Sequence, residues 1–157
     1  MAHYIQNERT DLKDSVLDLF VGNCIGTGWS RHVYEIKDQP DRVLKVEHSN
    51  RFFSNVMEWK VWEVVKDTEH ARWFAPCYDI SFNGFSLVQA RTVPLTSEQF
   101  AEITEVPSFL SDVFYGNFGY LDGRVVCHDY GRNNLMRLGS EASEMVHPSL
   151  YSPENGG

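Results

Sequence analysis

One stretch of the chain, residues 54–67, carries a helical apolar period, and short apolar runs separated by turn residues surround it. The apolar residues that recur at helical spacing are Met57, Val61, Val64 and Val65. Ser54 or Asn55 is the expected N-cap of this helix, because short polar side chains accept hydrogen bonds from the first free N–H groups. The pattern predicts a fold of short strands with one principal helix.

Pairs of short apolar runs predict antiparallel hairpins. The predicted pairs are 32–36 with 42–47, 71–80 with 85–93, and the residues on either side of Asp122-Gly123. Each pair is joined by turn-forming residues, and Asp-Gly is a strong signal for a tight hairpin turn.

Three further segments complete the pattern. Residues 15–21 suit a helix or a first strand and end at Gly22. Residues 96–110 predict one short helix, broken by Pro107. Residues 139–157 contain glutamates but no Lys or Arg, and we expect them to form an acidic, flexible tail.

The charge balance excludes one class of function. Among 157 residues, 14 Lys and Arg against 22 Asp and Glu give a net charge of −8. A protein that binds nucleic acid mainly through phosphates needs a cationic face, so direct nucleic-acid binding is not expected. The chain has no apolar run long enough to span a membrane and no signal-peptide pattern at its start, so we expect a soluble, cytoplasmic protein.

The first candidate functional residues form a group in the first half of the chain. Gly26-x-Gly28 lies between apolar runs, Lys45 lies inside the run Val-Leu-Lys-Val, and Glu58 or Glu63 follows on the helix. Each feature has an ordinary structural explanation: turn glycines, a lysine on an edge strand, and a glutamate on a helix surface. A lysine in a cleft, however, needs an acidic partner, which a helical glutamate can supply.

The second group is acidic and lies later in the chain. Asp112 precedes Asn117 by five residues, and Asp129 begins Asp-Tyr-Gly directly after an apolar strand. Any one of them alone is typical of a loop. Together they offer the hard oxygen ligands that Mg²⁺ on a triphosphate prefers.

In this order, the elements resemble those of the protein kinase superfamily, and most closely the small, divergent kinase-like proteins that bacteriophages and bacteria encode. The resemblance implies an α+β fold in one domain, residues 1–138. An N-lobe of about residues 15–90 would hold an antiparallel sheet and helix C, and a much reduced C-lobe would follow over about 91–138.

The resemblance also assigns roles in the first half. Gly26, Gly28 and Val33 match the glycine-rich loop, with Arg31 in place of its third glycine. Lys45 matches the strand lysine that contacts the α- and β-phosphates of ATP.

Two more positions of the nucleotide site follow from the same resemblance. Glu58 best matches the helix C glutamate that pairs with the lysine, and Glu63 is the alternative. Backbone groups of Gln89 to Arg91 occupy the place of the hinge that meets the adenine ring.

In the second half, Asp112 matches the catalytic base, and Asn117 and Asp129 match the Mg²⁺ ligands. In an alternative register, Asp129 and Asn134 would form the catalytic loop, but no metal-binding residue follows them.

The chain also departs from the family. Leu110 and Ser111 replace the His and Arg of the catalytic loop, and about twenty residues separate the hinge from Asp112. No activation segment follows Gly131, so ordinary docking of a peptide substrate is not expected.

Two functions remain open: a minimal phosphotransferase that uses ATP and Mg²⁺, and a pseudokinase-type module that inhibits or redirects a host protein. The acidic balance suits a basic partner, and an uncovered Trp29 would favour the second function. A third alternative keeps the fold without nucleotide.

Overall fold

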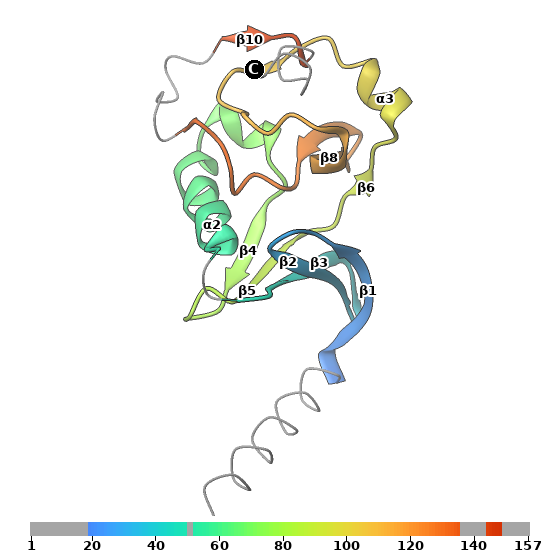
Figure 1. Ribbon diagram of the computed structural model, residues 1–157, viewed down its shortest axis with the longest axis vertical. Coiled ribbons are helices and arrows are strands. Elements are labelled where there is room, and N and C mark those ends of the chain that lie inside the picture. The colour runs from blue at the N-terminus through green and yellow to red at the C-terminus, as the bar shows by residue number, and fades with distance from the viewer. Residues whose placement is uncertain (1–18, 50–51, 136–143, 149–157) are drawn as a thin grey trace, which may run out of the picture.

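A computed structural model describes residues 19–49, 52–135 and 144–148 of the chain. The fold is α+β, with mostly antiparallel sheets and few helices (Figure 1). The five strands of the main sheet are β1 (Val21–Thr27), β2 (Arg31–Ile36), β3 (Gln39–Glu47), β4 (Cys77–Ile80) and β5 (Ser86–Ala90). Their order is β1-β2-β3-β5-β4, and every neighbouring pair is antiparallel.

The first two predicted hairpins are confirmed as β2–β3 and β4–β5. Gly84 closes the second turn with a φ of 71°, a left-handed value that favours glycine. The 3₁₀ helix η1 (Glu69–Trp73) precedes β4, so the predicted strand at 71–80 begins at Cys77. Gly22 lies inside β1 and does not end the preceding segment, of which residues 15–18 are outside the described residues.

The predicted helix is α2 (Ser54–Val65), which packs against β3, β4 and β5. The predicted N-cap is wrong: Phe53 occupies that position, in the left-handed region at φ 53°, and caps nothing with its side chain. The Glu47 carboxylate, at the end of β3, instead accepts the Asn55 N–H at 2.7 Å. A distant carboxylate thus replaces the local cap and benefits from the positive end of the helix.

The face that α2 buries also differs from the predicted apolar stripe. Its buried residues are Asn55, Glu58, Val61 and Val65. Met57 and Val64 are 38% and 47% exposed. Polar side chains occupy the N-terminal half of the buried face because they meet charged partners from the sheet, described below.

After Ala90 the chain leaves the main sheet and forms short elements at the other end of the molecule (Figure 1). These are β6 (Val93–Pro94), α3 (Ser97–Ala101), β7 (Val106–Pro107), the 3₁₀ turn η2 (Tyr115–Asn117), β8 (Phe118–Leu121), β9 (Arg124–Cys127) and β10 (Met145–Val146). The Asp122-Gly123 hairpin is confirmed as β8–β9, with φ values of 50° and 76° at the turn. The short helix predicted within 96–110 is α3, and Pro107 lies beyond it in β7.

Part of the predicted flexible tail is attached to the domain. β10 pairs with β7, and the Ser108 N–H donates to the Glu144 carbonyl at 2.7 Å. The expectation of a loose tail over 139–157 is therefore wrong for residues 144–148, because their backbone completes a two-stranded sheet. Residues 139–143 and 149–157 lie outside the described residues.

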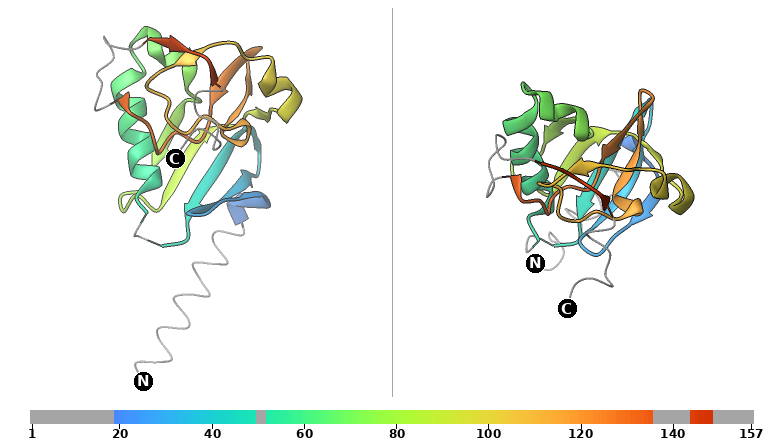
Figure 2. Two further views of the ribbon diagram at one scale, coloured as in Figure 1. Left: turned by 45° about the horizontal axis from the view of Figure 1, so that its top comes forward. Right: turned by 90° about the horizontal axis from the view of Figure 1, so that it is seen from above.

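A single cluster of buried side chains joins the two ends of the molecule. It contains Val61 and Val65 of α2, Leu87 of β5, and Phe109 and Phe118 from the second half of the chain. Figure 2 shows α2 alongside the main sheet and, in its left view, the later elements above the sheet. None of the described helices is long and apolar enough to cross a membrane.

Candidate functional site

A cavity of about 420 Å³ lies between the main sheet and the segments that follow it. Such a volume suits a small-molecule ligand. Of the residues singled out in the sequence, those that line it are Gly26, Gly28, Val33, Lys45, Gln89, Arg91, Asn117 and Asp129. Residues 26–45 and 89–129 thus meet around one space, although more than forty positions of chain separate them.

The two glycines of the β1–β2 hairpin are not required by their own backbone. Neither has a positive φ, and a Cβ atom would meet its nearest neighbour at 3.5 Å at Gly26 and 3.7 Å at Gly28, which are ordinary contacts. A need for positive φ angles in a turn therefore does not explain these two glycines. What their missing side chains provide is open space on the cavity wall.

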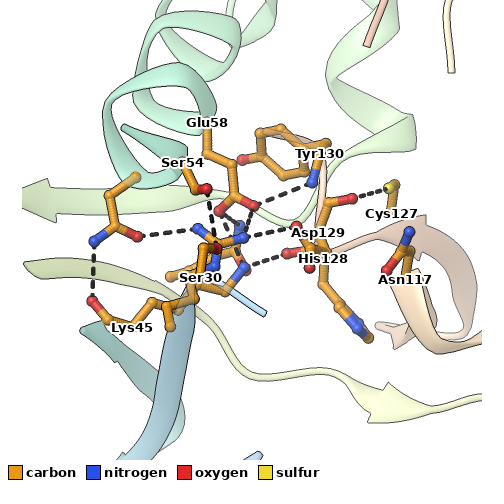
Figure 3. Close-up of polar contacts among 12 residues, drawn as sticks. Ser30, Lys45, Ser54, Glu58, Asn117, Cys127, His128, Asp129 and Tyr130 are labelled. Carbon is orange, nitrogen blue, oxygen red and sulfur yellow. Dashed lines mark hydrogen bonds and ion pairs between the residues drawn. The ribbon is translucent and has the colours of Figure 1, made fainter. Parts of the chain in front are cut away.

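Lys45 lies on β3, the central strand of the sheet, and its side chain is buried. It is therefore not an edge-strand lysine reaching for water. Its Nζ is 3.0 Å from Oε2 of Glu58 and also donates to the His128 carbonyl (Figure 3). Glu63 is exposed and pairs with Lys66, so Glu58 is the helical partner of Lys45.

Glu58 is fully buried and accepts hydrogen bonds from three strands and from the segment that follows β9. Besides Lys45, its carboxylate accepts Nη2 of Arg31, the backbone N–H of Tyr130 at 3.1 Å and, more weakly, Nε2 of Gln89 at 3.4 Å. A buried carboxylate is stable only with such partners. It connects the sheet, helix α2 and the Asp129-Tyr130-Gly131 segment (Figure 3).

Arg31 also lines the cavity, and the sequence reasoning assigned it no role there. Its side chain is 4% exposed and donates to Asn55 Oδ1 at 3.0 Å, to Glu58 and to Asp129 Oδ1 at 2.7 Å. Burial by itself would lower the pKa of Arg31, but the two carboxylates outweigh it and raise that pKa above its ordinary value. The alternation of side chains along β2 could have indicated that Arg31 faces the cavity, because Arg31 falls on the same face of the strand as Val33.

Asn117 and Asp129 lie on the side of the cavity opposite the sheet. Nδ2 of Asn117 donates to the Asp112 carbonyl at 2.9 Å, which leaves its Oδ1 as an acceptor. The Asp129 side chain is half-exposed, at 52%. Burial opposes its ionisation, but the charges of Arg31 and Lys45 outweigh burial and lower the pKa of Asp129.

Asp112 is exposed and lines a second cavity of about 380 Å³ beside the first. The two cavities share Gly28, Arg31 and Asp129 on their walls. Asn134, the asparagine of the alternative register, lines neither cavity, and its N–H donates to the Phe109 carbonyl.

The donor set for a metal ion is small. Within the described ranges, no group of three or more His, Cys, Asp and Glu side chains is placed to hold a metal. Asp129 and Asn117 together offer a carboxylate and an amide oxygen, which fits Mg²⁺ when the ligand's phosphates and water complete its shell. The residues therefore fit a phosphate-bound Mg²⁺ but not a metal held by protein alone.

His128 precedes Asp129, and its backbone carbonyl accepts from Lys45. Its side chain connects Gly116 to Thr92, which follows the last residue of β5 by two positions. Its Nε2 lies 2.9 Å from the Gly116 carbonyl, which can only accept, so Nε2 carries the proton and Nδ1 accepts the Thr92 hydroxyl at 2.7 Å. Burial lowers the pKa of His128 to about 4, and the charge of Lys45 adds to the effect. The imidazole is therefore neutral at pH 7, and its role is to hold two segments together through these hydrogen bonds.

The segment predicted to act as a hinge, Gln89 to Arg91, differs from the expectation in one respect. The N–H groups of Ala90 and Arg91 donate to the Pro76 and Asp41 carbonyls, both at 2.8 Å. These donors are already used, so an adenine contact here has to rely on carbonyl oxygens or on neighbouring side chains. Gln89 is one such neighbour: it is fully buried on the cavity wall, and its Oε1 has no hydrogen-bond partner among the described residues.

A scan against models of known protein families finds no match for this chain, and a search of curated proteins finds no relative.

Proposed function

We propose that this chain is a kinase-like protein that binds a nucleoside triphosphate, ATP, in the 420 Å³ cavity. The observation that carries the proposal is Lys45, which lines the cavity and is held by the fully buried Glu58, while the β1–β2 hairpin leaves space on the cavity wall at two glycines. Glu58 holds Lys45 extended, so the ammonium group contacts the phosphates as a fixed charge.

The proposed transfer chemistry uses the opposite wall. Asn117 and Asp129 would hold Mg²⁺ at the phosphates, where the ion neutralises charge. Asp112, in the adjoining cavity, accepts the proton of an acceptor hydroxyl. The hydroxyl oxygen forms a bond to the γ-phosphorus while the bond from that phosphorus to the bridging oxygen breaks, and ADP leaves.

Thermal unfolding of the full chain with ATP and MgCl₂ tests the binding step. Because a ligand that binds only the folded state stabilises it, we expect the Tm to rise with ATP concentration. Lys45→Met should reduce the rise, and Lys60→Met, which removes an exposed lysine on α2, should keep it. An unchanged wild-type Tm at millimolar ATP would contradict the proposal.

Transfer itself needs a second measurement. With γ-labelled ATP, we expect label to pass to a protein or small hydroxyl acceptor or to the chain itself. Asp112→Asn should abolish transfer and keep the thermal shift, because Asp112 does not line the nucleotide cavity.

A specific observation favours the alternative function, a pseudokinase-type binding module. Trp29, at the tip of the β1–β2 hairpin, is 85% exposed and contacts Phe52 edge-on at 6.4 Å between ring centres. Phe53 and Met57 continue this apolar surface with 58% and 38% exposure. Exposed aromatic clusters are typical of protein interfaces, so a host protein, a basic one given the net charge, is the proposed partner. ATP binding without transfer to any acceptor would select this alternative.

A further inference from the structure

Arg31 gives the cavity an internal cation next to the proposed metal ligand. Its Nη2 lies 2.7 Å from Oδ1 of Asp129, while Asn55 and Glu58 on helix α2 hold the same guanidinium from behind. Only 4% of the side chain is exposed, and two buried partners on the same helix fix this cation in place.

The local charges show what Arg31 changes. Lys45 and Glu58 neutralise one another, and without Arg31 the Asp129 carboxylate would face the cavity with an uncompensated charge. Such a carboxylate repels a triphosphate, and a divalent cation is the usual remedy. With Arg31 present, the cluster of Arg31, Lys45, Glu58 and Asp129 carries two positive and two negative charges and is neutral before any metal arrives.

We infer that Arg31 takes the place of a divalent cation at Asp129, so that the cavity binds the polyphosphate of a nucleotide without metal. A metal ion and Arg31 compete for the same carboxylate, and a metal reaches full coordination by Asp129 only when the Arg31–Asp129 pair opens. This inference rests on the proposed nucleotide site and adds to it a binding step that is independent of metal.

Isothermal titration of the wild-type chain with ATP is the first test, in EDTA and again in MgCl₂. We expect the two dissociation constants to agree within about three-fold, since a neutral cluster needs no added counter-ion. Binding that requires MgCl₂ overturns the inference and leaves the nucleotide site standing. Absence of binding under both conditions overturns the proposed function and the inference with it.

Removing the guanidinium is the second test. In Arg31→Gln, ATP binding in EDTA should weaken by about ten-fold or more while MgCl₂ restores it. Mn²⁺ binding in the presence of ATP, followed by electron paramagnetic resonance, should become tighter than in the wild type because Asp129 has lost its competitor. An Arg31→Gln variant with unchanged metal dependence and unchanged Mn²⁺ affinity overturns the inference.

Arg42→Gln is the matched control. It removes the same charge from an exposed Arg–Asp pair on the same sheet, with 3.8 Å between Arg42 Nε and Asp41 Oδ2. The control should bind ATP and Mn²⁺ as the wild type does, and an equal effect in both variants would reduce the role of Arg31 to net charge and overturn the inference. If Arg31→Gln does not fold, the wild-type comparison of EDTA with MgCl₂ still decides the matter.

Discussion

The two ends of the molecule are stabilised in different ways. Among the described residues, every buried polar or charged side chain belongs to the first region, residues 19–90. They are Arg31, Lys45, Glu47, Asn55, Glu58 and Gln89. In the second region, residues 91–135 and 144–148, the buried side chains are aliphatic and aromatic, apart from the hydroxyl of Tyr130 and the thiol of Cys127.

The difference follows from the lengths of the elements. The first region has strands of up to nine residues and a twelve-residue helix, whose backbones are satisfied and whose side-chain directions are fixed. It can therefore hold a connected network of charges in place. The second region has no strand longer than four residues within its described part, and packing of large apolar side chains is what holds it together. The candidate site lies where the charged network meets this apolar part.

The largest effect on stability should come from the apolar region. Phe109 is fully buried and stacks on Phe74 with 5.7 Å between ring centres. Phe109→Ala leaves a cavity and should lower the free energy of unfolding by about 4 kcal/mol, measured by urea denaturation. Phe82→Ala, at a fully exposed turn position, is the control and should leave the midpoint unchanged. A loss below about 1 kcal/mol for Phe109→Ala would contradict the view that packing supports this region.

Breaking the charged network should cost somewhat less. Glu58→Gln keeps the size of the side chain but leaves Arg31 and Lys45 without their shared carboxylate. Because Asp129 still pairs with Arg31, we expect a loss of about 3 kcal/mol in the free energy of unfolding. Glu63→Gln, which removes an exposed pair with Lys66, should be silent in the same urea titration. Equal midpoints for the two variants would remove the distinction between buried and exposed pairs.

The sequence predicted best those features that depend on neighbouring residues. The hairpins at 32–47 and around Asp122-Gly123 follow from local alternation and turn chemistry, and the structure confirms both. The order of Lys45, Glu58 and Asp129 along the chain also predicted that they belong to one site, and these residues lie together in the structure.

The features that the sequence did not predict depend on distant partners. The cap of α2 comes from Glu47, and its buried face is polar because Arg31 and Lys45 reach it from the sheet. In the sequence, Arg31 is notable only because it replaces the third glycine of the glycine-rich loop. Nothing in the neighbouring residues indicates that its guanidinium reaches Asp129, 98 positions further along the chain.

The two helix starts offer a smaller test of local against distant stabilisation. α3 begins with a capping box in which Thr96 accepts the Gln99 N–H at 3.2 Å, and Gln99 returns a contact to the Thr96 N–H at 3.0 Å. Thr96→Ala should therefore cost about 1 kcal/mol in thermal or urea unfolding. Ser54→Ala at the start of α2 should cost less than Thr96→Ala, because Ser54 does not cap its helix and loses only the hydrogen bond that its hydroxyl donates to Ser30 Oγ at 3.1 Å. The reverse order of these two losses would show that Ser54, and not Glu47, stabilises the start of α2.

Thiol reactivity compares the regions without perturbing either. Cys24 in β1 is exposed, whereas Cys77 and Cys127 are buried, one on each side of the boundary between the regions. Burial raises the pKa of Cys77 to about 12 and also raises the pKa of Cys127, so both remain protonated and unreactive at pH 8. With a chromogenic disulfide reagent, Cys24 should react at once in the native state, and all three cysteines should react in guanidinium chloride. Fast native reaction of Cys127 together with slow reaction of Cys77 would mean that the second region opens while the first stays closed. The weaker contacts would then lie in the second region.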